Sequence, residues 1–442
     1  MDIKTLQDLL DTRRFSEIRN QLSDMQEADI AELLEDLRIR ESLLVFRLLP
    51  KEIAAEVFSF LDVDRQSKLS SLVSDQELIE LMDELNFDDK IDLIEEVPAN
   101  VVKRILQHSN DTERTLINQF LNYPDDSAGS LMTIEFVGLK KEMTVSKAMA
   151  TIRQTGVDKE TIYTSYVTGH KRTLEGIISL KDLVLSDTEA IIGDIMETDV
   201  IFVNTHDDQE YIAEVFKKYD FLSLPVVDNE NRLVGIITID DIVDVIEEET
   251  TEDFQRMAAI EPTEIDYLEA STTVLAKKRL PWLVILMFSA YLTEMVMNGN
   301  NHLIVQFALA IYTPMLMSTG GNAGAQSATL VIRSITLGDI KFKDFFQVLW
   351  KEIRVGLMVG ATLGVLNCIR IFITNGDIYR AVMVGLTLIC TTTFAAIIGG
   401  TLPIVAKKLK LDPAIMASPL ITTIVDVTTL LIFFRIATLI LA

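Results

Sequence analysis

The chain is poor in the residues that most enzymes and disulfide-stapled proteins use. Its 442 residues include two cysteines, four histidines and two tryptophans. The cysteines, Cys368 and Cys390, both lie in apolar stretches, which excludes a disulfide framework and a cysteine metal site. No pair of histidines has metal-ligand spacing, no glycine loop is suited to phosphate, and no nucleophile accompanies a base. We therefore expect a protein that is not an enzyme.

Basic residues are scarce in the first 276 residues. This part holds 26 basic and 59 acidic residues, whereas the part from Lys277 onward holds 14 basic and 7 acidic residues. Such a negative field repels nucleic acid and attracts cations, so we expect no nucleic-acid partner. The first 15 residues also lack the apolar core of a secretory signal. We therefore expect the acidic part to lie in the cytoplasm.

Long apolar runs appear only after residue 280. About 20 apolar residues span a bilayer, and the runs predict five transmembrane helices, at 281–297, 303–320, 355–373, 381–406 and 413–441. Residues 303–332 carry no charge, so the second span either continues beyond one bilayer thickness or breaks at its glycines. Lysine and arginine gather before span one, between spans two and three, and between spans four and five. By the positive-inside rule, the N-terminus lies inside and the C-terminus outside.

The acidic part contains two different sequence patterns. Residues 1–125 show apolar residues at helical spacing, with Pro50 and Pro98 each closing a helical stretch. This pattern fits a curved layer of repeated short helices and a plain helical bundle equally well. Further on, LEGIISLKDL (174–183) recurs as LVGIITIDDI (233–242), which indicates two copies of one strand-and-helix unit.

These two copies resemble tandem CBS domains, at residues 126–188 and 189–249. Each copy has an apolar strand, a glycine turn and a Ser/Thr-x-x-Asp helix start. CBS domains bind adenine nucleotides, so the resemblance makes Thr238 and Asp241 candidates for contact with an ATP ribose. The alternative interpretation is that these two side chains only cap the helix.

An acidic run follows the second copy and leads toward the first span. Residues 240–253 hold eight carboxylates and no basic residue. Like charges at helical spacing destabilise a helix, and a divalent cation would remove the repulsion. The segment leads toward span one through about 25 residues, so we predict a cation sensor here.

A single aspartate lies deep in the last apolar run. Asp426 is 13 residues past Pro413, about 20 Å along a helix, near the middle of the bilayer. An ionised carboxylate there has a large unfavourable free energy unless it is paired or faces water, so Asp426 is a candidate functional residue. The alternative is a protonated Asp426 hydrogen-bonded to a neighbouring helix. Thr422 extends the same polar stripe, and Asn322 in the segment STGGNAGAQS supplies an amide oxygen.

Four further segments have distinctive sequences: KRLPWLVIL (278–286), GGNAGAQSATLVIR (320–333), LDPAIMASPLITTIVDVTTLL (411–431) and the segment 219–253. Through them the whole chain resembles the MgtE family of magnesium transporters. The resemblance implies a multidomain fold: an all-α N-terminal domain, tandem α/β CBS domains, a long connecting plug helix at 250–276, and five transmembrane helices from residue 277 to 442.

The resemblance also implies function. It suggests a homodimer in the cell inner membrane whose pore is lined by spans two and five, with Asp426 as the central ion-binding carboxylate. Intracellular Mg²⁺ would bridge regulatory carboxylates and close the pore, and ATP would tune this response. The implied regulatory residues are Asp88, Asp92, Asp241, Asp244, Glu249, Glu252, Asp253 and Asp412.

We therefore expect a Mg²⁺-gated channel or transporter for magnesium. The runner-up is a CBS-regulated secondary transporter for another divalent cation or solute. A membrane-tethered sensor that transports nothing would not need Asp426.

Overall fold

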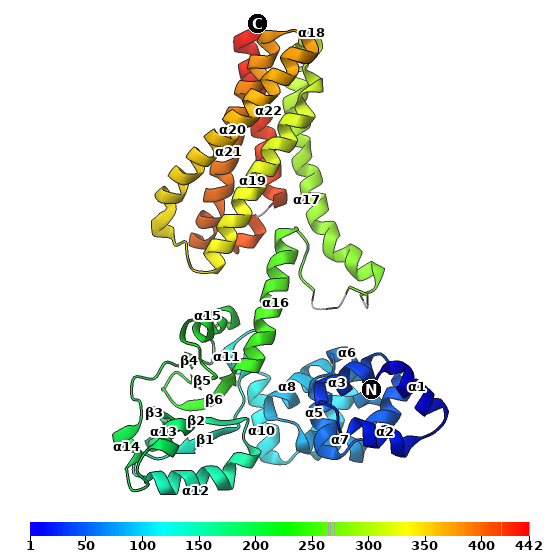
Figure 1. The fold of residues 1–442 in the computed structure, drawn as a ribbon, viewed down its shortest axis with the longest axis vertical. Coiled ribbons are helices and arrows are strands. Elements are labelled where there is room, and N and C mark those ends of the chain that lie inside the picture. The colour runs from blue at the N-terminus through cyan, green and yellow to red at the C-terminus, as the bar shows by residue number, and fades with distance from the viewer. Residues whose placement is uncertain (264, 266, 269, 417, 442) are drawn as a thin grey trace. The chain divides into compact units, whose positions relative to one another are not determined.

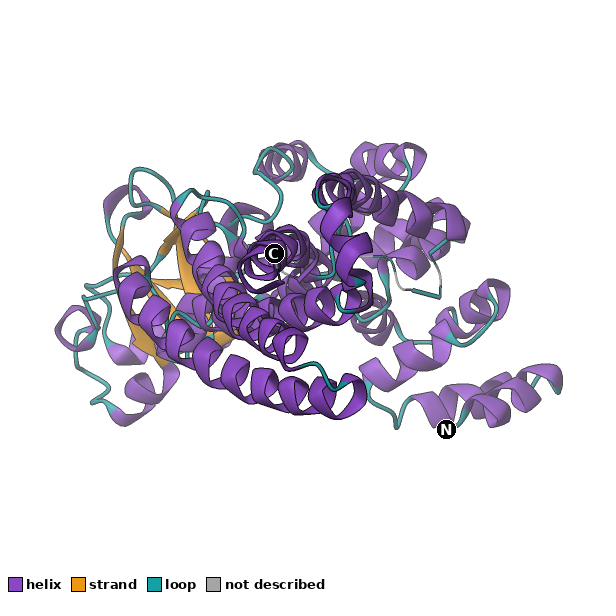
Figure 2. Ribbon diagram, turned by 90° about the horizontal axis from the view of Figure 1, so that it is seen from above, coloured by secondary structure: helices purple, strands orange, loops and turns teal. Residues whose placement is uncertain are grey.

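The computed structural model describes residues 1–263, 265, 267–268, 270–416 and 418–441. The chain forms two compact units, Met1–Ile246 and Glu247–Ala442. Figure 1 follows the order of elements along the chain, and Figure 2 shows that strands occur in two small sheets amid helices.

The first unit begins with ten short helices. They are α1 (Ile3–Asp11), α2 (Phe15–Leu22), α3 (Glu27–Glu35), α4 (Ile39–Phe46), α5 (Lys51–Ser59), α6 (Val63–Leu72), α7 (Asp75–Glu84), α8 (Phe87–Glu96), α9 (Ala99–His108) and α10 (Asp111–Phe120). Helices two apart in sequence pack together: α3 on α5, α5 on α7 and α7 on α9 form one row, and α4 on α6 and α6 on α8 form the other. This two-row stacking favours the repeated layer over the plain bundle.

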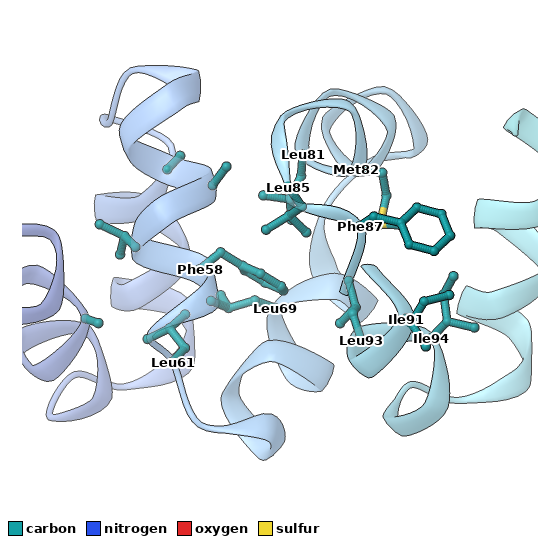
Figure 3. Packing of buried hydrophobic residues seen from close by; sticks show 14 of the residues in the cluster. Phe58, Leu61, Leu69, Leu81, Met82, Leu85, Phe87, Ile91, Leu93 and Ile94 are labelled. Atoms are coloured by element: carbon teal, nitrogen blue, oxygen red, sulfur yellow. The ribbon is translucent and has the colours of Figure 1, made fainter. Parts of the chain in front are cut away.

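Local sequence sets the ends of these helices. Ser74 and Glu77 form a reciprocal capping box at the start of α7, with Ser74 N–H donating to Glu77 Oε2 at 2.8 Å. Pro50 and Pro98 stand at the N-caps of α5 and α9, so each proline ends one helix and begins the next. Figure 3 shows how Phe58 and other buried apolar side chains fill the space between the rows.

The repeated sequences fold into two copies of one small sheet. The first copy contains α11 (Ala128–Leu131), β1 (Phe136–Leu139), α12 (Val145–Thr155), β2 (Thr161–Thr168), β3 (Leu174–Ser179) and α13 (Leu180–Leu185). The second contains α14 (Ile192–Ile195), β4 (Val203–Asn204), α15 (Gln209–Tyr219), β5 (Ser223–Val227), β6 (Leu233–Thr238) and α16 (Ile239–Met257). Short 3₁₀ turns lie at Gly156–Asp158 and His170–Arg172.

Both sheets have the same topology, because the central strand pairs in parallel with the first and antiparallel with the third. The two copies also touch: the buried Tyr166 hydroxyl lies 2.7 Å from Ser223 Oγ. The predicted repeat is thus confirmed as two paired subdomains.

The predicted position of the connecting helix is wrong. α16 begins at Ile239 and ends at Met257, and the next helix begins only at Thr272, so the range 250–276 is not one helix. Ala259 has a positive φ of 53°, and Ile260 N–H donates back to Gln255 O, which closes the helix end. Pro262 follows two residues later and cannot continue a helix.

The second unit holds the long apolar helices. They are α17 (Thr272–Gly299), α18 (Asn301–Phe307), α19 (Thr313–Thr336), α20 (Phe345–Asn375), α21 (Ile378–Lys408) and α22 (Ser418–Leu441), with 3₁₀ turns at Leu309–Ile311, Phe342–Asp344 and Pro413–Met416. In the described residues, four helices are long and apolar enough to cross a membrane, and α18 with α19 makes a fifth if that bent pair is one span.

The second predicted span differs from the structure. α18 and α19 are bent by 93° at a break where Ala308 adopts a positive φ of 53°. The break therefore lies before the glycines, which fall inside the continuous helix α19. Of the two alternatives for this span, a break at the glycines is wrong, because these glycines serve close helix packing instead of interrupting the backbone.

Candidate functional site

Carboxylates from three parts of the first unit converge. Asp88 and Asp92 lie one turn apart on α8, and Asp241 lies in the first turn of α16. The mutual repulsion among these groups also involves Asp89, Asp240, Glu135 and Glu160. We call Asp88, Asp89, Asp92, Glu135, Glu160 and Asp241 the acidic cluster.

Burial dominates the electrostatics of the acidic cluster. It raises the pKa of Asp88 to about 7, with a further contribution from the charge of Asp89. Burial and then the charge of Asp88 raise the pKa of Asp92 to about 8, of Asp241 to about 7 and of Glu160 to about 8. Asp88 Oδ1 and Glu160 Oε2 are buried and have no hydrogen-bond partner among the described residues. The ionised cluster therefore needs positive charge.

The donor set of the acidic cluster suits a hard cation. All its ligand atoms are oxygens, which Mg²⁺ prefers, and Mg²⁺ usually keeps several waters and binds only one or two carboxylates directly. In the part of the chain that the structure describes, no three His, Cys, Asp or Glu side chains are arranged to hold a metal ion together. The arrangement thus fits a hydrated divalent cation that bridges carboxylates rather than a closed cage.

The two halves of the CBS pair differ chemically. Tyr163, Ser179, Lys181 and Leu222 line a cavity of about 600 Å³ in the first unit. Thr238 and Asp241, the predicted ribose contacts, do not line this cavity. Instead, Thr238 Oγ1 donates to Asp241 Oδ2 at 2.7 Å, within the acidic cluster. Ser179, the counterpart of Thr238 in the first copy, lines the cavity instead.

A second charged group lies at the end of α16, within the second unit. Arg256 pairs with Glu252 one turn earlier on α16 and with Asp412, which precedes the turn Pro413–Met416. Burial and the charge of Asp412 raise the pKa of nearby Asp253. The structure therefore brings three predicted regulatory carboxylates together and adds a guanidinium that the sequence did not indicate.

Two predicted regulatory residues lie between these groups. Asp244 is exposed, one turn after Asp241 on α16, and Glu249 is half-buried one turn before Asp253. Neither is among the residues whose charge raises the pKa values of Asp88 or Asp92. The structure thus places both on the connecting helix without assigning either to the acidic cluster.

Close helix packing surrounds Asp426 in the second unit. A Cβ on Gly321 of α19 would lie 2.9 Å from the Thr422 methyl group of α22, and a Cβ on Gly320 would lie 3.0 Å from Thr429 Oγ1. These glycines let α19 lie directly against the polar stripe of α22. Asp426 is half-buried, and its Oδ1 is buried without a hydrogen-bond partner among the described residues. Asn322 is exposed on the neighbouring turn of α19.

Comparison with known proteins agrees with this layout. Residues 313–436 match the MgtE model of divalent cation transporters, 25–126 match the MgtE intracellular N domain, and 128–187 and 192–248 match CBS domains. The magnesium transporter MgtE of Thermus thermophilus is 36% identical over 98% of this chain and 96% of its own length. The chain belongs to the MgtE family. The MgtE of Bacillus subtilis is 32% identical over 94% of this chain and 95% of its own length.

Two solved structures of related proteins resemble about half of this chain. A crystal structure of the cytosolic domain of the Mg²⁺ channel MgtE in complex with ATP has a TM-score of 0.53 and 35% identity, and covers 55% of this chain and 100% of that one. The soluble part of a magnesium transporter has a TM-score of 0.52 and 29% identity, and covers 56% of this chain and 97% of that one. The multidomain fold expected from the MgtE resemblance is confirmed: helical N domain, CBS pair and apolar helices.

Sequence reasoning about this MgtE member missed several polar residues. Asp89 is adjacent to a predicted ligand, but Glu135 and Glu160 come from the first CBS copy and enter the acidic cluster only through tertiary packing. The sequence analysis also did not identify Arg256, which follows the acidic residues of α16. Its spacing of four from Glu252 was the one available signal.

Proposed function

We propose that this chain conducts Mg²⁺ across the cytoplasmic membrane and that cytoplasmic Mg²⁺ closes the path by binding its acidic side chains. The main support for this proposal is the environment of Asp426. Its buried Oδ1 has no hydrogen-bond partner among the described residues, and its helix, α22, packs against the glycines of α19. A carboxylate at this depth requires a compensating charge or water. Thr422 and Asn322 border the same position and would contact the water shell of the ion.

The inner-membrane location and the orientation rest on the loop charges. Lysine and arginine lie before α17, between α19 and α20 and after α21, which supports a cytoplasmic side for these loops and the N-terminus and an outer side for the C-terminus. We further propose a homodimer, because one chain supplies a single mid-membrane carboxylate, and a second copy would supply its counterpart across a shared path. The half-buried position of Asp426 and the exposed position of Asn322 support this assembly.

The gate follows from electrostatic repulsion. At low Mg²⁺ the carboxylates within the acidic cluster repel one another, and so do the carboxylates at the end of α16 within the second unit; in each group this repulsion favours separation of the elements that carry them. Bound Mg²⁺ offsets this repulsion and stabilises the packed, closed arrangement. Asp88, Asp92 and Asp241 would act in the first unit, and Glu252, Asp253 and Asp412 in the second. We assign Asp244 and Glu249 to the same response because they continue the acidic face of α16.

ATP is the proposed ligand of the cavity lined by Tyr163, Ser179 and Lys181. The tyrosine offers a stacking surface for adenine, the hydroxyl can reach the ribose, and the ammonium can pair with phosphate. The ATP complex of the related cytosolic domain supports this proposal. The comparisons do not favour the runner-up, a secondary transporter for another solute.

The test of the conduction path is growth and uptake in magnesium-deficient cells. Asp426→Ala should abolish Mg²⁺ uptake while the protein remains in the membrane, because no other acidic side chain lies in α22. Glu294→Ala, which removes an exposed carboxylate from α17, is the matched control and should retain uptake. Retained uptake in the Asp426 variant would contradict the proposed path.

A further inference from the structure

The end of α16 already contains a cation. Arg256 Nη2 pairs with Glu252 Oε1, and its Nη1 pairs with Asp412 Oδ2. The three side chains are 34%, 31% and 22% exposed, so the ion pairs are largely shielded from water. Arg256 and Asp412 are 156 residues apart in sequence. One guanidinium therefore joins the connecting helix to the segment that leads into α22.

The remaining contacts fix Asp412 in place. Its Oδ1 accepts the N–H of Ala414 at 2.7 Å, so Oδ2 is left to face Arg256. Asp253 lies close enough for the charge of Asp412 to act on it. Without Arg256, Glu252, Asp253 and Asp412 would face one another with no positive charge from this helix end. With it, the group still carries excess negative charge and can attract a divalent cation.

A guanidinium suits this position better than an ammonium. Its planar fork presents separate N–H groups to two carboxylates at once, and it remains charged at every physiological pH. A divalent cation attracted by the remaining negative charge of Glu252, Asp253 and Asp412 would add to the contact that Arg256 already makes. The guanidinium thus performs part of the task assigned to Mg²⁺ in the proposed gate.

We propose that Arg256 is a resident counter-ion that keeps the end of α16 attached to Asp412 when Mg²⁺ is low, so that Mg²⁺ strengthens this contact instead of creating it. The inference rests on the proposed gating function and adds a residue that sets how strongly the gate depends on Mg²⁺. How firmly the end of α16 stays attached to Asp412 without Mg²⁺ then depends on the Arg256 side chain.

Hydrogen exchange of the α16 backbone amides tests the proposal in the full-length chain in lipid nanodiscs. Without Mg²⁺, amides between Glu249 and Met257 should exchange about tenfold faster in Arg256→Gln than in wild type, because two charge-assisted, partly shielded interactions are lost. Saturating Mg²⁺ should return the variant to the wild-type rate. Arg256→Lys, which holds fewer oxygens at once, should fall between the two.

The matched control is Arg354→Gln. Arg354 lies in the same unit, is exposed, and forms no ion pair among the described residues. This variant should exchange like wild type.

Two results would overturn the proposal. Equal exchange rates for Arg256→Gln and wild type without Mg²⁺ would show that Arg256 does not attach the end of α16 to Asp412. Fast exchange that Mg²⁺ does not reverse would show that Arg256 only maintains the helix end. A wild-type chain whose protection ignores Mg²⁺ would instead contradict the gate, while the comparison without Mg²⁺ would still decide the role of Arg256.

Discussion

Neutralising Asp88 should stabilise the first unit when no divalent cation is present. Burial and nearby charge raise the pKa of this carboxyl from 3.8 to about 7. At about 1.4 kcal/mol per unit, ionised Asp88 destabilises the fold by at most about 4 kcal/mol at pH 8. Relaxation and water reduce this effect, so we expect Asp88→Asn to add about 2 kcal/mol to the free energy of unfolding.

The sign of the pH dependence follows from proton binding. The folded state holds a proton on Asp88 between about pH 4 and pH 7, whereas the unfolded chain has lost it. Stability of wild type should therefore fall as the pH rises through this window. Below about pH 4 the carboxyl is neutral in both the folded and the unfolded state, so the advantage of Asp88→Asn should nearly vanish there.

The assay is thermal unfolding of residues 1–257, since the cytosolic parts of relatives have been crystallised separately. At pH 8 without Mg²⁺, the variant should melt about 4 to 8 °C higher than wild type. Added Mg²⁺ should raise the melting temperature of wild type more than that of the variant, because the variant has lost a ligand.

Asp83→Asn is the matched control, because Asp83 is exposed on α7 outside the acidic cluster. It should change neither the melting temperature nor its response to Mg²⁺. An Asp88 variant that is less stable than wild type at pH 8, or that responds fully to Mg²⁺, would refute the reasoning.

Two further predictions concern packing and nucleotide binding. A Cβ on Gly399 of α21 would lie 2.2 Å from Gly324 O, so Gly399→Val should destabilise the apolar helices by about 1 to 3 kcal/mol in detergent. The control is Gly299→Val, which should not destabilise them, because a Cβ on Gly299 would meet no heavy atom within 4 Å. Equal melting temperatures of the two variants would contradict this packing. Tyr163→Ala should weaken ATP binding at least about tenfold in calorimetry on the cytosolic region, and Tyr211→Ala, outside the cavity, should not; unchanged affinity would remove ATP from this cavity.

Local patterns predicted the elements well. The recurrence of LEGIIS and LVGIIT became strands β3 and β6 in equivalent places, because the alternation and turn chemistry of a strand are encoded within a few residues. Apolar length likewise marked α17, α20, α21 and α22. The single carboxylate in α22 identified Asp426 without any structure, since a mid-membrane carboxylate is unusual on energetic grounds alone.

Contacts between residues far apart in the chain could not be predicted from the sequence. Glu160 enters the acidic cluster and Arg256 reaches Asp412 only because distant segments pack together, and no local spacing encodes such a meeting. The break at Ala308 was also missed, because alanine gives no local signal for a left-handed backbone. The end of α16 depended on a left-handed Ala259 for the same reason.

The most direct test of the gated-path account is Mg²⁺ flux through the purified full-length chain in lipid vesicles, measured with zero and with millimolar Mg²⁺ on the cytoplasmic face. Wild type should conduct at zero Mg²⁺ and close at high Mg²⁺. The combined neutralisation of Asp241, Asp244, Glu249, Glu252 and Asp253 should conduct under both conditions. Equal inhibition of wild type and this variant, or no flux through wild type at zero Mg²⁺, would contradict the account.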